Sequence, residues 1–377
     1  MSFFDQGFRP FFLGASLWAL LGIPLWIALF SGMVALPHVG DMEAWHAHEM
    51  IFGYGGAALA GFLLTAVPNW TGIAAPKGRQ LAIIFGLWIL ARLANLASEA
   101  IPDIALAFLN VSAPTMVLAY VAGAIGKSGN SRNWVVVGLV GLFILCDLLM
   151  STEAFEEYGE HGGLALLVLL ITLIGGRIIP NFTRNWFRSR GREGEPAPFG
   201  LVDKVTFLLS ILALVAFVLE LEGPLGAMLM FAAALANLFR LSRWQGLSTT
   251  AEPLILFLHI AHLWLPVGYL LFGLSWITDA VSHSAAFHAL TVGVIGSTTL
   301  IVMTRATLGH SGRALTSTPL MTTYLVALQI SALVRLLYEF TGHPIALLWI
   351  VGGAWMVAYG GFLVAHWNAF FQPRLDA

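Results

Sequence analysis

The hydrophobic positions of this chain fall into long continuous runs that short polar segments separate. The runs lie near residues 11–31, 44–68, 80–98, 103–125, 133–151, 162–181, 201–219, 224–241, 252–274, 284–305, 318–338 and 344–368. Each has roughly the 20 residues that a helix needs to cross a bilayer. Continuous rather than alternating runs exclude a membrane β-barrel. The pattern predicts an all-α polytopic membrane protein with about twelve transmembrane helices.

The charges between the runs alternate in sign from one loop to the next. One set of loops carries the basic residues, which are Arg9, Lys77, Arg79, Lys127, Arg132, Arg184, Arg188, Arg190, Arg192, Lys204, Arg240, Arg243, Arg313 and Arg374. The other set carries Asp41, Glu43, Glu99, Asp103, Glu153, Glu156, Glu157, Glu160, Glu220, Glu222, Asp279 and Glu339. Because basic loops stay in the cytoplasm, both termini are predicted to be cytoplasmic. The first run shows no cleavage site and is expected to be a span, and the basic segment 185–201 a plain connector.

Composition supports the membrane class and restricts the chemistry. Only 10% of the 377 residues are charged, against about 25% in soluble domains. The net charge of −2 argues against a nucleic-acid surface. A single cysteine, Cys146, allows neither a disulfide framework nor a thiolate metal site. Any bound metal must therefore be held by histidines.

A weak internal repeat links three of the predicted spans. Residues 68–71 (PNWT) end the second span, and residues 180–183 (PNFT) end the sixth. The second, sixth and tenth spans each begin at the outer face with histidine, namely His46, His161 and the pair His283 and His288. The spacing predicts one transmembrane domain of three pseudo-symmetric four-helix units, residues 1–126, 127–245 and 246–377.

Two histidines open the second span. His46 and His48 are two residues apart, so they point to different sides of the helix and can serve two different centres. Glu49 is three residues from His46, where it can orient that imidazole or accept a proton. The alternative is a hydrogen-bonded cluster at the membrane surface.

His288 opens the tenth span, also at the outer side. His46 and His288 are thus expected at one depth, and both spans are rich in glycine and alanine. Two imidazoles from facing helices with small neighbours are typical axial ligands of a b-type haem. Close helix packing is the other explanation for the small residues.

Further histidines lie deeper or in loops. His259 and His262 share one face of the ninth span near mid-bilayer, which favours a metal or proton site over an internally hydrogen-bonded pair. His310, beside Arg305, is either a cation or proton entry point or part of a basic interface cluster. His161 is equally consistent with an interface residue and a metal ligand. The remaining histidines near the outer loops, His38, His283 and His343, are expected to be solvated.

Three charged residues fall inside apolar runs. Arg92 and Arg335 can each bind a haem propionate, because guanidinium matches carboxylate geometry. Pairing of an arginine with Asp147 is the alternative.

The chain resembles the NnrS family over nearly its whole length. The segments that carry the resemblance are residues 8–12 (FRPFF), 45–53 (WHAHEMIFG), 175–180 (GGRIIP), 258–259 (LH), 288–293 (HALTVG) and the stretch from Thr304-Arg305 to Gly309-His310. The resemblance implies a twelve-span bacterial inner-membrane protein that contains haem and copper and is linked to nitric oxide tolerance. It also implies a tyrosine where this chain has His262, which favours His259 as the metal ligand.

A more distant likeness is to the catalytic subunit of haem–copper oxidases and nitric oxide reductases. Residues 46–52 (HAHEMIF) are similar to the haem-ligand motif of their second span, which implies His46 as a haem ligand. The seventh span lacks the histidine pair of a binuclear centre, so a standard oxygen-reducing site is not expected.

Together these observations predict a haem b membrane protein, with copper, that responds to or detoxifies nitric oxide. Haem is expected at His46 and His288, and a second metal at His48 and His259, with His262 or His161 as further ligands. Membrane lipid and nitric oxide are the expected partners. Whether the protein turns nitric oxide over stays open. The alternatives are a metal or proton transporter or sensor, and a quinol-linked electron-transfer subunit.

Overall fold

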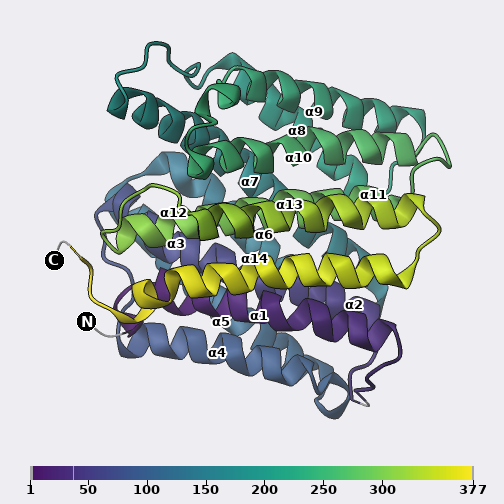
Figure 1. Ribbon diagram of the computed structural model, residues 1–377. Helices are drawn as coiled ribbons and strands as arrows, with labels where there is room; N and C mark the ends of the chain where they lie inside the picture. The colour runs from purple at the N-terminus through teal and green to yellow at the C-terminus, as the bar shows by residue number, and fades with distance from the viewer. Residues whose placement is uncertain (1–2, 37, 376–377) are drawn as a thin grey trace. The chain divides into compact units, whose positions relative to one another are not determined.

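The computed structural model describes residues 3–36 and 38–375, and these residues form helices without any strand. The long helices, in chain order, are α1 (Phe8–Phe30), α3 (Gly56–Thr71), α4 (Arg79–Asn95), α5 (Asp103–Ser128), α6 (Trp134–Met150), α7 (Glu156–Ser189), α8 (Leu201–Val218), α9 (Pro224–Ser242), α10 (Pro253–Ser275), α12 (Ser297–His310), α13 (Pro319–Phe340) and α14 (Ile345–Phe371) (Figure 1). The short helices α2 (Met42–His48) and α11 (His283–His288) each lead into a π-helical segment. These segments, Glu49–Gly55 and Ala289–Gly296, continue into α3 and α12.

The predicted all-helical membrane architecture is confirmed. Within the described residues, eleven helical stretches are long and apolar enough to span a membrane, among them Met42–Thr71 and His283–His310. The remaining predicted span, the third in chain order near residues 80–98, corresponds to α4, which has 17 residues and a length of about 26 Å. That length is slightly short of the roughly 30 Å hydrocarbon core.

Helix α7 is longer than its apolar run predicts. It has 34 residues, or about 51 Å, and it continues to Ser189, into the segment expected to be a connector. The extension persists because Phe187 on it is buried while Arg188 faces solvent. The loop that follows is tied back to α7, because Arg188 donates to the Glu195 carboxylate at 2.6 Å and Arg184 lies 3.3 Å from it. The Arg188 hydrogen bond lowers the pKa of Glu195 below its ordinary value.

The chain divides into two compact units. Unit 1 comprises Met1–Leu166, Met303–Ala314 and Tyr359–Ala377, and unit 2 comprises Leu167–Val302 and Leu315–Ala358. The division falls within α7, α12 and α14. The three predicted four-helix repeats are not tested by it and stay a prediction.

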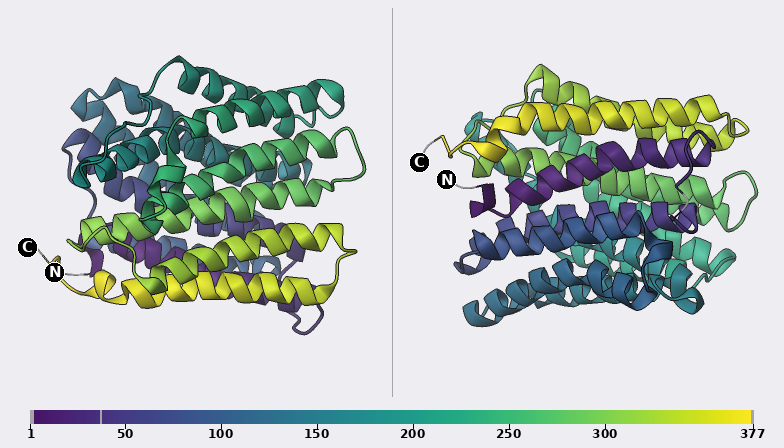
Figure 2. Two further views of the ribbon diagram at one scale, coloured as in Figure 1. Left: turned by 45° about the horizontal axis from the view of Figure 1, so that its top comes forward. Right: turned by 90° about the horizontal axis from the view of Figure 1, so that it is seen from below.

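In unit 1, α1 packs on α3 and on the first π-helical segment, and α5 packs on α3, α4 and α6. The start of α1 and the end of α14 lie side by side (Figures 1 and 2), joined by a hydrogen bond from Arg9 Nη2 to the Gln372 carbonyl at 2.8 Å. In unit 2, α9 lies between α8 and α10, and α10 packs on the second π-helical segment. Each unit therefore contains one π-helical segment in its core.

Candidate functional site

His46 lies in α2 of unit 1, on a helix start that the sequence specifies well. The Asp41 carboxylate caps α2 by accepting from the backbone N–H groups of Glu43 and Ala44 at 2.7 and 3.0 Å. The His46 ring stacks on Trp26 of α1, with centroids 4.4 Å apart and planes at 30°. This stack fixes the ring three residues before the π-helical segment begins.

His48 has a carboxylate oxygen at each ring nitrogen. Nδ1 lies 3.1 Å from Glu49 Oε1, and Nε2 lies 3.0 Å from Asp147 Oδ1. Ionised carboxylates only accept hydrogen bonds, so both His48 nitrogens donate and the ring is an imidazolium. An imidazolium has no lone pair for a metal. Of the two roles predicted for His48, these contacts support the hydrogen-bonded cluster rather than the metal ligand.

Arg92 completes this cluster in unit 1. Its Nη1 donates to Glu49 Oε1 at 2.7 Å and its Nη2 to Asn110 Oδ1 at 3.2 Å. The two cations, Arg92 and His48, balance the two carboxylates. Glu49 therefore pairs with His48 and Arg92, and these bonds do not support the predicted role of orienting His46. The alternative pairing of an arginine with Asp147 is not observed, because Asp147 bonds to His48.

The backbone of the first π-helical segment makes room for this cluster. A Cβ atom at Gly53 would meet Arg92 Nη1 at 2.4 Å. The Gly53 carbonyl also accepts from Trp88 Nε1 at 3.0 Å. A glycine at this position is thus required by the close approach of the guanidinium.

His288 lies in α11 of unit 2, and its Nδ1 nitrogen is hydrogen-bonded. Its Nδ1 is 2.8 Å from the Ser284 carbonyl, so Nδ1 carries the proton and Nε2 carries the lone pair. Histidine ligands of metals are usually oriented by such a bond.

The turn that carries His288 is itself held by Glu339 of α13. Glu339 accepts from Ser282 and Ser284, both at 2.7 Å, and from Arg335 Nη1 at 2.5 Å. Arg335, predicted as a propionate partner, is thus paired with Glu339, and it also donates to Ser284 at 3.0 Å.

His259 lies in α10 of unit 2, and its Nε2 nitrogen is hydrogen-bonded. The Thr183 hydroxyl donates to the Ile179 carbonyl at 2.9 Å, so it accepts from His259 Nε2 at 2.9 Å. Nδ1 of His259 then carries the lone pair, is buried, and has no hydrogen-bond partner among the described residues. A Cβ atom at Gly246 would lie 2.7 Å from this nitrogen, so only glycine fits beside the His259 ring.

His262 is on the same face of α10, as predicted, but its environment is cationic. Arg240 Nη2 lies 2.8 Å from His262 Nε2, and because arginine can only donate, Nε2 accepts and the proton is on Nδ1. Neither nitrogen offers a lone pair to a metal, and the guanidinium would repel a cation. Arg240, counted from the sequence among the loop charges, is 1% exposed inside α9.

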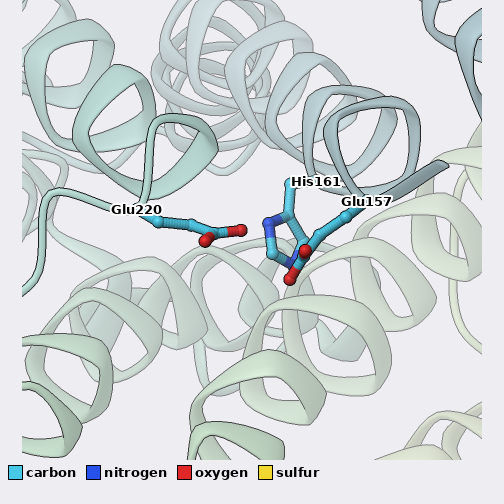
Figure 3. Close-up of side chains that lie close together, drawn as sticks. All are labelled: Glu157, His161 and Glu220. Atoms are coloured by element: carbon cyan, nitrogen blue, oxygen red, sulfur yellow. The ribbon is translucent and has the colours of Figure 1, made fainter. Parts of the chain in front are cut away.

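The remaining candidates lie at the ends of helices. Arg305 and His310 are in the last turns of α12, and the His310 ring is 6.2 Å from that of Phe8. Glu157 and His161 are one turn apart on α7 (Figure 3).

Several residues of these clusters were missed by the sequence reasoning. Asn110, Thr183, Ser284 and Trp26 are contact partners that were not predicted, although Thr183 belongs to the repeated segment 180–183. Asn110 alone had a signal, because it is an amide inside an apolar run. The others have residue types that are ordinary in membrane helices.

The fold and these clusters define a polytopic helical membrane protein with histidines and paired charges buried among its spans. A sequence model of the NnrS family, described as NnrS protein, matches residues 2–374. The chain belongs to this family, as the sequence resemblance indicated. No curated protein matches the chain.

Proposed function

We propose that this protein is a haem b protein of the bacterial inner membrane that binds nitric oxide and contributes to nitric oxide tolerance. Membership of the NnrS family suggests a role in the nitric oxide response. The proposal adds the cofactor, its ligands and the membrane in which it acts. Both termini are proposed to be cytoplasmic, on the charge pattern of the loops.

The observation that carries the proposal is the position of the two π-helical segments. One begins at Glu49, three residues after His46, and the other at Ala289, directly after His288. π-Helical segments are rare, because their backbone hydrogen bonds are less favourable than those of an α-helix, and they occur mostly at functional sites. Here both follow the histidines that the sequence selected as haem ligands.

The contacts of the two histidines support them as haem ligands. The Ser284 carbonyl accepts from His288 Nδ1, which is the kind of bond that orients histidine ligands. The His46 ring is held by its stack on Trp26. When bound, haem would supply nitric oxide binding or electron transfer. His46 and His288 are the residues that would hold it.

Copper is proposed at His259 rather than at His48 or His262. Only His259 of these three has a buried nitrogen that is unprotonated and unpartnered among the described residues. Imidazole is a good ligand for copper. His48 and His262 are proposed instead to hold charge and hydrogen bonds in their own clusters.

The haem proposal is tested by the optical spectrum of the full chain, purified from cells supplied with haem. A Soret band is expected, and His46→Ala and His288→Ala should each remove or shift it. His38→Ala, which removes an exposed histidine, should leave it unchanged. Absence of the band from the unmodified protein would refute the haem and favour a metal or proton transporter.

Nitric oxide handling is tested separately on the reduced protein under argon. Binding is expected to change the spectrum with one nitric oxide taken up per haem. Continued consumption with an electron donor would make the protein a reductase, whereas no spectral response would leave an electron-transfer subunit as the better assignment.

A further inference from the structure

Three segments of unit 1 meet around the start of α1. The rings of Phe8 and His310 bring the end of α12 to the start of α1, and Arg9 donates to Gln372 at the end of α14. Beyond α14, the backbone N–H of Leu375 donates to the Ser311 carbonyl at 3.1 Å. The last residues of the described chain are thereby fastened across this end of the unit.

The three segments contribute an excess of positive charge. Their basic residues are Arg9, Arg305, His310, Arg313, His366 and Arg374. Arg313 lies within electrostatic range of both Arg9 and His366. The acid within range of Arg9 is Asp5, but none of the ion pairs among the described residues includes Arg9.

Arg9 is the centre of this group because it is completely buried. Its exposed fraction is 0%, yet only Nη2 has a hydrogen-bond acceptor, the Gln372 carbonyl. Nε and Nη1, which together carry three N–H groups, are buried without an acceptor in the described part of the chain. The Phe8 ring, 5.9 Å from the guanidinium, compensates the charge only in part. A buried cation with unmet donors is strongly destabilising unless an anion pairs with it.

We propose that this end of unit 1 is an oxyanion site whose ligand is a phosphate group. A phosphate has enough acceptor oxygens for the free N–H groups of Arg9, and guanidinium is the side chain best suited to it. Arg313 and Arg374 supply further charge nearer the surface, where both are more exposed than Arg9. Helix α1 also begins here without a side-chain cap.

The phosphate comes either from a phospholipid headgroup or from free inorganic phosphate. The loop charges put this end of the molecule at the cytoplasmic membrane surface, where headgroups lie. Residues 372–375 are exposed, and the Gln372 carbonyl of this segment accepts from Arg9 Nη2. The site is separate from the proposed haem ligand, because Arg9 is about 25 Å along α1 from Trp26, on which His46 stacks.

Phosphorus bound to the purified full chain tests the proposal, with arms that separate the two sources. Protein purified in phosphate-free detergent buffer is extracted for phospholipid, and inorganic phosphate is then titrated by calorimetry. The same protein is compared in nanodiscs of phosphatidylglycerol and of phosphatidylcholine. Retained phospholipid and a phosphatidylglycerol preference identify the headgroup, and saturable heat from inorganic phosphate identifies the free ion.

Arg9→Gln is expected to weaken the binding by about 10- to 100-fold, the effect of losing a charged hydrogen-bond donor. Arg79→Gln, which removes an exposed arginine expected on the same membrane side, is the matched control and should leave binding unchanged. Arg313→Gln, in a half-buried loop position, should weaken binding and serves if Arg9→Gln does not fold.

Equal binding by the unmodified protein, Arg9→Gln and Arg313→Gln would overturn the proposal, as would the absence of bound phosphate in every arm. Unchanged phosphate binding by Arg9→Gln alone would also overturn it. Failure of the haem proposal alone would leave phosphate binding intact, so the two proposals fail separately.

Discussion

Single buried side chains determine which histidines of this chain remain able to bind a metal. His48 is an imidazolium between two carboxylates, and His262 accepts from a guanidinium. His259 differs from His262 only in its neighbours, since a threonine rather than an arginine meets its Nε2. Both are buried histidines of α10, so the difference comes from their hydrogen-bond partners.

Asp147→Asn should destabilise unit 1 strongly. The substitution removes one of the two anions that balance His48 and Arg92 and leaves a buried positive charge, which costs about 3 kcal/mol. Thermal unfolding in detergent measures the effect. Asp279→Asn, at an exposed position, is the control and should change the free energy of unfolding by less than about 0.5 kcal/mol. Equal effects of the two changes would contradict the buried charge cluster.

Gly246→Ala should displace the His259 ring, because the added Cβ would lie 2.6 Å from its Cγ. If His259 Nδ1 binds copper, the copper content falls while the haem spectrum stays. Gly353→Ala adds the same methyl group to unit 2 where no atom lies within 4 Å, and it should change neither quantity. Copper content measured by mass spectrometry distinguishes the two variants. Unchanged copper in Gly246→Ala would exclude His259 Nδ1 as a copper ligand.

At the scale of elements, short helices that lead into π-helical segments place the proposed haem ligands. Helix α11 has only six residues and is fastened to α13 through Glu339, which binds Ser282 and Ser284. The orientation of His288 thus depends on a neighbouring helix more than on its own.

Glu339→Gln should therefore weaken haem binding without removing a ligand. The amide cannot pair with Arg335 or accept two serines as strongly, so His288 loses its fixed orientation. A loss of about 10- to 100-fold in haem affinity is expected, as for other groups that orient metal ligands. Haem titration of the apoprotein measures it, with His38→Ala, at an exposed position away from Glu339, as the unaffected comparison. Normal affinity in Glu339→Gln would show that α13 does not position His288.

The loop after α7 should loosen in acid. Because Arg188 lowers the pKa of Glu195 in the folded protein, the link is present above the unfolded value, about 4.5, and is lost as the pH falls through the folded one. Limited proteolysis at residues 190–194 should be faster at about pH 3 than at about pH 7. The Glu195→Gln variant should be cleaved at the same fast rate at both pH values. A pH-independent cleavage rate in the unmodified chain would contradict a stabilising Arg188–Glu195 ion pair.

At the scale of the whole molecule, the twelve predicted spans are an even number, so both ends of the chain are expected on one side of the membrane. Reporter fusions test this topology. A fluorescent protein should fold at both termini, and an alkaline phosphatase fused after residue 279 should be active. Phosphatase activity at either terminus would reverse the predicted orientation.

The architecture was predictable because each span needs a long apolar run and the charged residues of the loops stay out of the hydrocarbon core. The same charge alternation led to a wrong expectation for two residues. Arg9 and Arg240 were expected in loops, because they stand at the ends of their apolar runs, but both are buried inside helices.

The polar contacts of the sites were not predictable for a related reason. Hydrogen bonds such as Arg92 to Asn110 or His259 to Thr183 depend on helix rotation, which apolar runs without a strong periodicity do not specify. Only side chains whose chemistry is costly in lipid, such as the histidines and Arg92, were conspicuous in the sequence.

The hydrogen bond between Arg9 and Gln372 has a consequence for biosynthesis. The two residues are 363 positions apart, and a ribosome needs about 20 to 70 s to add that many. Throughout this time the first helix is already in the membrane with its guanidinium unmatched. Nascent chains that stall before residue 372 should therefore be marked for quality control by an exposed arginine at their first helix.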